Sequence, residues 1–315
     1  MKKISIITPC YNEEEGLFDC TKKITELFSN ELKEYNYEHI ICDNNSNEKT
    51  IKILREISTN NNKIKIILNA KNYGSVKSTF NGIKSSSGDA VLLFFPVDMQ
   101  DPPEIIPELI KKWEKGFDFV VGCRKNREEL FFMKSIRKFF YIILKKFSKN
   151  KIPLHVADFQ LVDRKIINKI VKLKDNFPFI RTLAFEYSDN FDTINYTWKR
   201  RTFGKSKEPL KDYINSAMNG LISVSDAPFR LILISGFIVS FFSLSYGVYA
   251  LFYNIFVQTD LDKGMPTMLI SILVFSGFQL LVLGFIGEYI TSIHNLIKKN
   301  VEVNEKEKIN FDLKE

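Results

Sequence analysis

The residues best suited to chemistry lie in one short stretch, Val97–Glu104, which reads VDMQDPPE. The apolar run Leu92–Phe95 precedes it, so the stretch is predicted to follow a buried strand. Asp98 and Gln100 project from the same side of an extended segment, as residues i and i+2 do. Mg²⁺ often takes only one or two carboxylates and keeps phosphate oxygens and waters as its other ligands. The pattern therefore favours a sparse metal site that holds a diphosphate.

Polar clusters also follow three earlier strand-like runs. In a parallel sheet, ligands bind beyond the carboxyl ends of the strands, which is where these clusters would meet. Each cluster alone is compatible with ordinary turn chemistry, but four in succession favour a site. The first turn has no G-x-G-x-x-G pattern, which argues against a dinucleotide site. The clusters are Pro9–Glu13, Asp43–Ser46, Asn69–Gly74 and Asp98–Asp101.

The segments that must position these clusters alternate between strand-like and helix-like over residues 3–122. This alternation predicts a mostly parallel α/β sheet with helices on both faces. Further along, Ala157–Asp163 and Asn195–Arg201 are predicted to be extended. The earlier predicted strands are Ile4–Thr8, His39–Cys42, Ile64–Leu68, Ala90–Phe95 and Phe117–Val121. The predicted helices are Glu13–Leu32, Ile51–Ile57, Val76–Ile83 and Ile105–Trp113.

Two long apolar runs predict a membrane anchor. No charged residue occurs in Leu231–Thr259 or in Met265–Gly287, and each run exceeds the roughly 20 residues that a helix needs to cross a bilayer. We therefore expect two transmembrane helices within 229–297. Basic residues flank the pair, so the positive-inside rule predicts that the N-terminal domain and both termini are cytoplasmic, at the inner membrane. The mixed-charge tail, 298–315, is expected to be cytoplasmic and poorly ordered from Val301 onward.

Composition limits the classes of molecule that this chain is expected to bind. The net charge of +8 fits nucleic acid, anionic lipid or a phosphorylated substrate. Because two spans are predicted, lipid bilayer and phosphate are favoured and nucleic acid is not expected. The four cysteines show no CxxC pairing, which predicts small buried residues in a reducing compartment.

Two segments before the first apolar run have an amphipathic pattern. In Leu130–Phe147, bulky apolar residues recur at helical spacing opposite a lysine-rich and arginine-rich side. This pattern favours a helix in the membrane interface at 130–148, although a helix packed on the core would have similar spacing. A second juxtamembrane helix is predicted at 209–228. Between them, the basic stretch Lys199–Lys207 is either a solvated surface or a loop that holds anions.

Several motifs together resemble those of polyprenyl-phosphate glycosyltransferases. These enzymes are relatives of dolichyl-phosphate mannose synthase and undecaprenyl-phosphate glucosyltransferase, in the inverting GT-A class, family 2 type. VDMQDPPE is similar to the DADLQDPPE stretch of that family. The resemblance continues in order along the chain and covers nearly all of it. The other matching stretches are TPCYNEEEG at the start, Asp43–Thr50, Lys71–Gly74, Gly122–Arg124, Ala157–Leu161 and Tyr196–Lys207.

The resemblance implies a GT-A domain over 1–208 and a role for individual residues. Asp158 would be the catalytic carboxylate. Asp98 and Gln100 would hold Mg²⁺ or Mn²⁺. The residues implied in donor nucleotide binding are Pro9, Tyr11, Asn12, Glu13, Asp43, Asn45, Asn72, Gly74 and Val97. The residues implied in phosphate or acceptor binding are Arg124, Arg201, Ser206 and Lys207.

The implied reaction is inverting transfer of a sugar from a nucleotide-sugar, a UDP-sugar before a GDP-sugar, to a membrane polyprenyl phosphate. The partners would be the nucleotide-sugar, the polyprenyl phosphate and the bilayer, and a homo-oligomer is left open. One alternative is a membrane glycosyltransferase that elongates a saccharide. Another is a degenerate transferase domain that acts as a membrane scaffold, which is motivated by the departures at Pro96, Asn44 and Trp198. In all, this sequence departs from the family pattern at four positions. These positions are Pro96 and Asn44, each in place of Asp, and Gln160 and Trp198, each in place of Arg.

Overall fold

The computed structural model describes residues 1–126, 153, 155–172, 180–199, 235–238, 241–242, 245–246, 249, 265–297 and 303–311. The chain divides into two compact units. One comprises Met1–Ile214 with Asn300–Glu315, and the other comprises Asn215–Lys299. The predicted helices at 130–148 and 209–228 lie outside the described residues, as does the basic stretch beyond Lys199.

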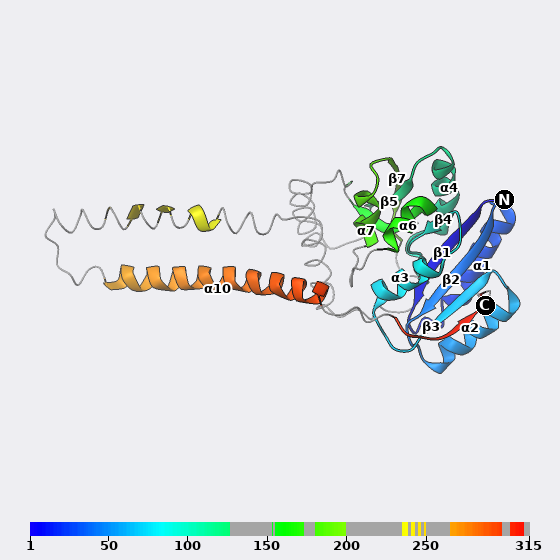
Figure 1. Ribbon diagram of the computed structural model, residues 1–315, viewed down its shortest axis with the longest axis horizontal. Coiled ribbons are helices and arrows are strands. Elements are labelled where there is room, and N and C mark those ends of the chain that lie inside the picture. The colour runs from blue at the N-terminus through cyan, green and yellow to red at the C-terminus, as the bar shows by residue number, and fades with distance from the viewer. Residues whose placement is uncertain are drawn as a thin grey trace. The chain divides into compact units, whose positions relative to one another are not determined.

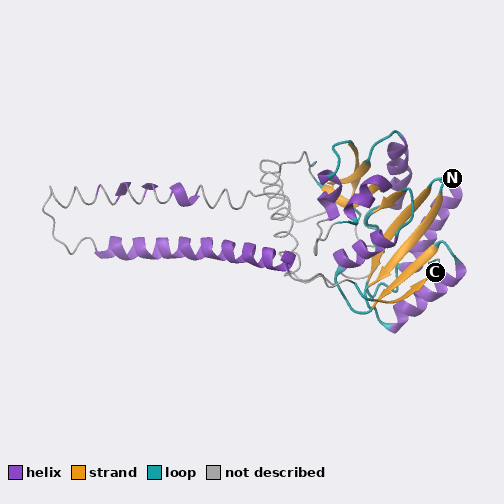
Figure 2. Cartoon of the chain, viewed as in Figure 1, coloured by secondary structure: helices purple, strands orange, loops and turns teal. Residues whose placement is uncertain are grey.

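The described part of the first unit is built on one eight-stranded sheet with the order β7-β5-β6-β4-β1-β2-β3-β8 (Figures 1 and 2). The predicted mostly parallel α/β sheet is confirmed, since only β6 and β8 run antiparallel to their neighbours. The strands are β1 (Lys3–Cys10), β2 (Asn36–Asp43), β3 (Ile64–Asn69), β4 (Ala90–Leu92), β5 (Phe119–Asn126), β6 (Val156–Asp163), β7 (Phe191–Thr197) and β8 (Glu305–Ile309).

Helices cover both faces of the sheet because its central strands are apolar on both sides. Ile6 and Ile41 point into one core, and their neighbours Ile7 and Ile40 point into the other. The first core is closed by α1 (Leu17–Asn30), α2 (Glu48–Asn60) and α4 (Ile106–Glu114). The second is closed by α3 (Ser75–Ser85), α6 (Arg164–Ile170) and α7 (Ile180–Leu183). Two short 3₁₀ turns, η1 (Pro103–Ile105) and η2 (Ala184–Glu186), complete these layers.

Some predicted boundaries move for local reasons. The first helix begins at Leu17 rather than Glu13, because Asn12 adopts a left-handed backbone with φ 52° and keeps the chain in a turn. β4 ends at Leu92, although the Phe95 amide still donates to the Ile7 carbonyl at 2.8 Å. Pro96 follows and has no amide hydrogen to continue such pairing.

The prediction of a poorly ordered tail is wrong for residues 303–311. Glu305–Ile309 form β8, which pairs antiparallel with β3 at the edge of the sheet. The charged sequence EKEKI gives little apolar signal, so its strand structure depends on the open edge of β3, which supplies backbone hydrogen-bond partners.

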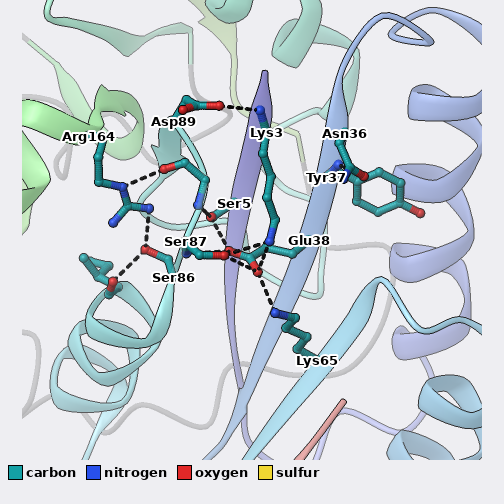
Figure 3. A network of polar contacts seen from close by, with 12 residues as sticks. Lys3, Ser5, Asn36, Tyr37, Glu38, Lys65, Ser86, Ser87, Asp89 and Arg164 are labelled. Carbon is teal, nitrogen blue, oxygen red and sulfur yellow. Dashed lines mark hydrogen bonds and ion pairs between the residues drawn. The ribbon is translucent and has the colours of Figure 1, made fainter. Parts of the chain in front are cut away.

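A buried carboxylate ties together the amino ends of the central strands (Figure 3). Glu38 lies 2.8 Å from the ammonium of Lys3 and 2.9 Å from that of Lys65. It also accepts hydrogen bonds from the Ser5 hydroxyl at 2.6 Å and the Ser87 amide at 2.7 Å. Burial raises the pKa of Glu38, but these donors outweigh burial and lower it to about 2. The network fixes one end of the sheet, opposite the carboxyl ends where a site was predicted.

All four cysteines are buried and carry free thiols, as predicted. In the second unit, α10 (Met265–Ile297) is the longest described helix. By length and apolar character, no helix among the described residues qualifies as a membrane span.

Candidate active site

The first two polar clusters are locked together at the carboxyl ends of β1 and β2. The Asn12 amide donates to the Ser46 hydroxyl at 2.9 Å, and the Asn47 amide donates back to Asn12 Oδ1 at 2.8 Å. Asn47 also begins α2, since its side chain accepts from the Thr50 amide at 3.0 Å. These hydrogen bonds join the two turns into one unit.

Asp43 offers a buried acceptor at this edge. Its side chain is 1% exposed, and one oxygen accepts from the Ser46 amide at 3.1 Å. The other oxygen, Oδ1, has no hydrogen-bond partner among the described residues. Burial raises the pKa of this carboxyl, and the hydrogen bonds from Ser46 oppose that rise. Because an unpaired buried oxygen is costly, Asp43 is suited to accept a hydrogen bond from a bound group such as a nucleobase.

Asn44 joins the second cluster to the third. Its Nδ2 donates to Asn72 Oδ1 at 2.7 Å, and its Oδ1 accepts from the Tyr73 amide at 2.9 Å. Asn72 Oδ1 also accepts from the Gly74 amide at 2.9 Å. A carboxylate at position 44 would supply the acceptor but not the donor. The departure from the family pattern therefore has a structural role, because it holds the Asn72–Gly74 turn from which α3 starts.

Asp98 and Gln100 lie together after β4, in a sharp turn at Met99 rather than in the extended segment that the sequence predicted, and their role as metal ligands stays a prediction. The Gln100 amide donates to Asp98 Oδ1 at 3.1 Å, which closes a local turn around Met99. Gln100 is held in turn by Lys199, whose amide donates to the Gln100 carbonyl at 3.0 Å. No group of three or more His, Cys, Asp or Glu side chains that could hold a metal occurs within the described part of the chain. One carboxylate and one amide still fit a sparse Mg²⁺ or Mn²⁺ site whose other ligands come from diphosphate and water.

Backbone strain is concentrated at the same edge. Asn12, Asn45 and Met99 have φ values of 52°, 63° and 50°. Asparagine tolerates this region, but methionine does so at a cost of order 1–3 kcal/mol. The Met99 conformation turns the chain sharply between the two proposed metal ligands.

The second carboxylate of the motif, Asp101, is committed to the fold. It is fully buried and forms a bidentate pair with Arg124 at 3.0 and 2.8 Å. The Tyr196 hydroxyl donates to the same carboxylate, and burial, followed by the Asp101 charge, raises the pKa of that phenol. The Arg124 guanidinium also lies 5.2 Å from the centre of the Trp198 ring. These four side chains tie the segment after β4 to β5 and β7.

Asp158, the predicted catalytic carboxylate, lies near the start of β6 with a partner that was not predicted. Arg181, from α7, binds it in a bidentate pair at 3.2 and 2.7 Å. Burial raises the pKa of Asp158, but Arg181 and then Arg124 outweigh burial and lower it. Both side chains stay partly exposed, 25% for Asp158 and 29% for Arg181. The pair therefore presents an ionised carboxylate and a guanidinium to whatever binds there.

Gln160 hydrogen-bonds to the backbone that carries this pair. Its Nε2 donates to the Arg181 carbonyl at 2.7 Å and to the Ala157 carbonyl at 2.9 Å. The side chain is fully buried, and its bond to the Arg181 carbonyl joins β6 to α7. Gln160 stands where the family pattern has an arginine, and it is long enough to bridge β6 and α7 without burying a charge.

The structure brings most of the predicted residues to the carboxyl ends of the strands. Pro9 lies opposite Cys42, one position before the last pair of β1 and β2, in which Cys10 faces Asp43. Tyr11 is 40% exposed, and Val97 is buried directly before Asp98. Arg124 is brought to the edge too, but its guanidinium contacts Asp101. Arg201, Ser206 and Lys207 lie outside the described residues. Sequence reasoning missed Arg181, which stands 23 positions after Asp158 with no motif around it.

Comparison with known proteins places this chain among sugar transferases. The profile described as Glycosyl transferase family 2 matches residues 5–171. The chain is 33% identical over 295 residues to the "Uncharacterized glycosyltransferase YkcC" of Bacillus subtilis (strain 168), covering 93% of this chain and 90% of that one. It is 32% identical over 310 residues to the "Bactoprenol glucosyl transferase" of Shigella phage SfV, covering 97% and 100%.

A more distant likeness is found among solved structures. The glucosyl-3-phosphoglycerate synthase from Mycobacterium tuberculosis in complex with Mn²⁺, UDP-glucose and phosphoglyceric acid aligns with a TM-score of 0.49 and 15% identity. The alignment covers 69% of this chain and 77% of that one.

Proposed function

Because this chain belongs to glycosyltransferase family 2, we propose that it transfers a sugar from a UDP-sugar to a membrane polyprenyl phosphate with inversion at the anomeric carbon. One observation carries the proposal. The carboxyl edge of a single sheet presents the buried acceptor of Asp43, the Asp98–Gln100 pair and the Asp158–Arg181 pair in succession. The name of the phage relative, a bactoprenol glucosyl transferase, supports the choice of acceptor.

The nucleoside end of the donor belongs at β1, β2 and β3. Asp43 Oδ1 is free to accept a hydrogen bond from a base N–H. The exposed residue Tyr11 directly follows Cys10, which pairs with Asp43 at the end of β1. The turns around Asn12, Asn45 and Asn72 are held in place by their mutual hydrogen bonds. Turns that are fixed in advance in this way lower the entropy lost when the donor binds.

Asp98 and Gln100 would hold the cation. When bound, Mg²⁺ or Mn²⁺ neutralises the charge that develops on the departing nucleoside diphosphate. The Asp101–Arg124–Tyr196 cluster positions this segment, because it anchors the next residue after Gln100 in the core.

In the transfer step, an oxygen of the acceptor phosphate attacks the anomeric carbon from the face opposite the diphosphate. The new carbon–oxygen bond forms as the old one breaks, and the electron pair leaves with the nucleoside diphosphate. A phosphate monoester is largely dianionic at neutral pH, since its second pKa is about 6, so no strong base is needed. Asp158 instead holds Arg181, whose partly exposed guanidinium would bind the acceptor phosphate and orient it.

The membrane part of the proposal rests on the sequence. The uncharged runs Leu231–Thr259 and Met265–Gly287 would cross the bilayer, with the catalytic unit on the cytoplasmic side of the cell membrane. The amphipathic segments 130–148 and 209–228 would lie in the interface. Arg201, Ser206 and Lys207 would then hold phosphate beside a lipid tail that stays in the bilayer.

The test uses the full chain, purified in detergent, with polyprenyl phosphate and a panel of UDP- and GDP-sugars. We expect one sugar to be transferred to give a polyprenyl-phosphate-sugar, and only from UDP donors. Transfer to a lipid-linked saccharide but not to polyprenyl phosphate would establish the elongating alternative. If no donor in the panel is consumed or bound, the chain is a scaffold and the proposal fails.

A further inference from the structure

The strand β8, at Glu305–Ile309, lies beside the proposed donor site although that site is formed by residues near the start of the chain. Its register with β3 shifts between Leu68 and Asn69, since Leu68 pairs with Glu307 but Asn69 pairs with Glu305. Lys306 is therefore the extra residue of a β-bulge, with no partner opposite it on β3. A bulge bends its strand and re-aims one side chain, and such features are common beside active sites.

The re-aimed side chain is directed at the turn after β2. The Lys306 ammonium donates to Asn45 Oδ1 at 3.0 Å, and Asn45 is one of the residues held at positive φ, 63°. Lys306 remains exposed, so its other donors can reach a ligand. Burial raises the pKa of Asp43, and the Lys306 charge is the smallest of the effects that oppose this rise.

Asn304, two residues before Lys306, contacts the turn after β3. The Ala70 amide donates to the Asn304 carbonyl at 2.8 Å, and the Asn304 amide donates to the Tyr73 hydroxyl at 3.1 Å. Residues 304–306 thus contact both the turn after β2 and the turn after β3. The hydrogen bond between Asn44 and Asn72 joins the same two turns. The edge formed by β2 and β3 is complete only when β8 is in place.

Other contacts fix β8 without Lys306. Arg55 on α2 forms a bidentate pair with Glu307 at 2.8 and 2.5 Å. Asn81 on α3 donates to Glu305 at 2.7 Å, and Asn310 donates to two backbone carbonyls, those of Ser58 and Ile64, at 2.7 and 2.8 Å. Lys306 is therefore dispensable for the attachment of the strand, and its position is available for a different role.

We propose that Lys306 is a positioning residue for the donor, which fixes the Asn45 turn against the nucleoside and presents a positive charge to the anionic nucleoside diphosphate. This inference rests on the proposed function, because it assigns a role within the same donor site. It adds β8, which follows α10 in the chain, to the set of segments that bind the donor.

The experiment compares UDP binding, in the presence of MgCl₂, to the full chain and to three variants in detergent by calorimetry. Lys306→Met removes the charge, Lys306→Arg keeps it, and Lys308→Met is the matched control, because Lys308 pairs with Glu305 at 2.9 Å on the same strand. Loss of a hydrogen bond to a charged group predicts about tenfold weaker UDP binding for Lys306→Met. We expect UDP binding to weaken less than threefold for Lys306→Arg and to stay unchanged for Lys308→Met.

Two further measurements separate a positioning role from a structural one. Tryptophan fluorescence should give the same unfolding temperature for Lys306→Met and Lys308→Met. In the transfer assay, Lys306→Met should raise KM for the UDP-sugar and leave kcat within twofold. Equal UDP affinity for wild type and Lys306→Met would overturn the inference, as would equal losses in both Met variants. If wild type binds neither UDP nor GDP, the proposed function itself falls, and the role of Lys306 with it.

Discussion

Replacement of Asp101 by Asn tests whether the second carboxylate of the VDMQDPPE stretch serves the fold rather than the metal. Asp101 is 0% exposed and its partner Arg124 is 12% exposed. Asn at position 101 leaves a buried guanidinium without its counter-charge, for which the expected loss is about 3–5 kcal/mol. For a unit of this size, where 1 kcal/mol shifts Tm by roughly 2–4 °C, the melting temperature should fall by about 6–20 °C.

The same stretch supplies the control. Glu104 pairs with Lys199 at 3.4 Å, and these side chains are 61% and 56% exposed. An exposed pair contributes about 0–1 kcal/mol, so Glu104→Gln should lower Tm by no more than about 4 °C. The two carboxylates are three positions apart and differ mainly in burial.

Tryptophan fluorescence is the appropriate assay. The chain has two tryptophans, Trp113 and Trp198, and both lie in the first unit. Trp198 also contacts Arg124, so the emission reports on the cluster directly. A melting temperature for Asp101→Asn within 2 °C of wild type would refute the buried-pair reasoning. Activity lost at unchanged Tm would reassign Asp101 to the metal site.

Three other predictions follow from the site and its support. Asp158→Asn should abolish sugar transfer yet keep UDP affinity within about twofold, because Asp158 lies on the acceptor side; unchanged turnover would remove it from the mechanism. Chelation by EDTA should abolish transfer, and added Mg²⁺ or Mn²⁺ should restore it; full activity in EDTA would exclude the assigned role of Asp98 and Gln100. The pKa of Glu38 falls from 4.5 to about 2 on folding, so its stabilisation is present above pH 4.5 and is lost as the pH falls toward 2. The stability difference between wild type and Glu38→Gln, measured by denaturant unfolding, should therefore shrink by about 3 kcal/mol across that window, and a constant difference would contradict the network's charge state.

The sequence predicted the sheet and the positions of the candidate residues on it because both depend on local patterns. Apolar runs such as Ile4–Thr8 mark buried strands, and polar turn residues after them mark the carboxyl edge. The resemblance to family 2 then selected residues within those turns. Asp43, Asp98 and Asp158 all lie at that edge in the structure.

Pairing between distant side chains was not predictable from such patterns. Asp98 and Asp101 have the same chemical type in the same motif, and only the fold places Arg124 and Tyr196 against the second one. Arg181 has no motif of its own, yet α7 brings it to Asp158. From the sequence alone, Asn44 is only a replacement for an acidic residue, whereas in the structure its amide donates a hydrogen bond to Asn72 Oδ1. Each of these depends on contacts across the sheet, which carry no signal along the chain.

The late position of β8 has a consequence for biosynthesis. Asn310 binds the start of β3 although 246 residues separate it from Ile64. At about 5–20 residues per second on the ribosome, β3 waits roughly ten to fifty seconds for its neighbour. During that interval its open edge is a template for pairing with other chains, while both long apolar runs are still being made. Completion of the sheet thus follows synthesis of both apolar runs, and a chaperone that shields the β3 edge would be of most use in that interval.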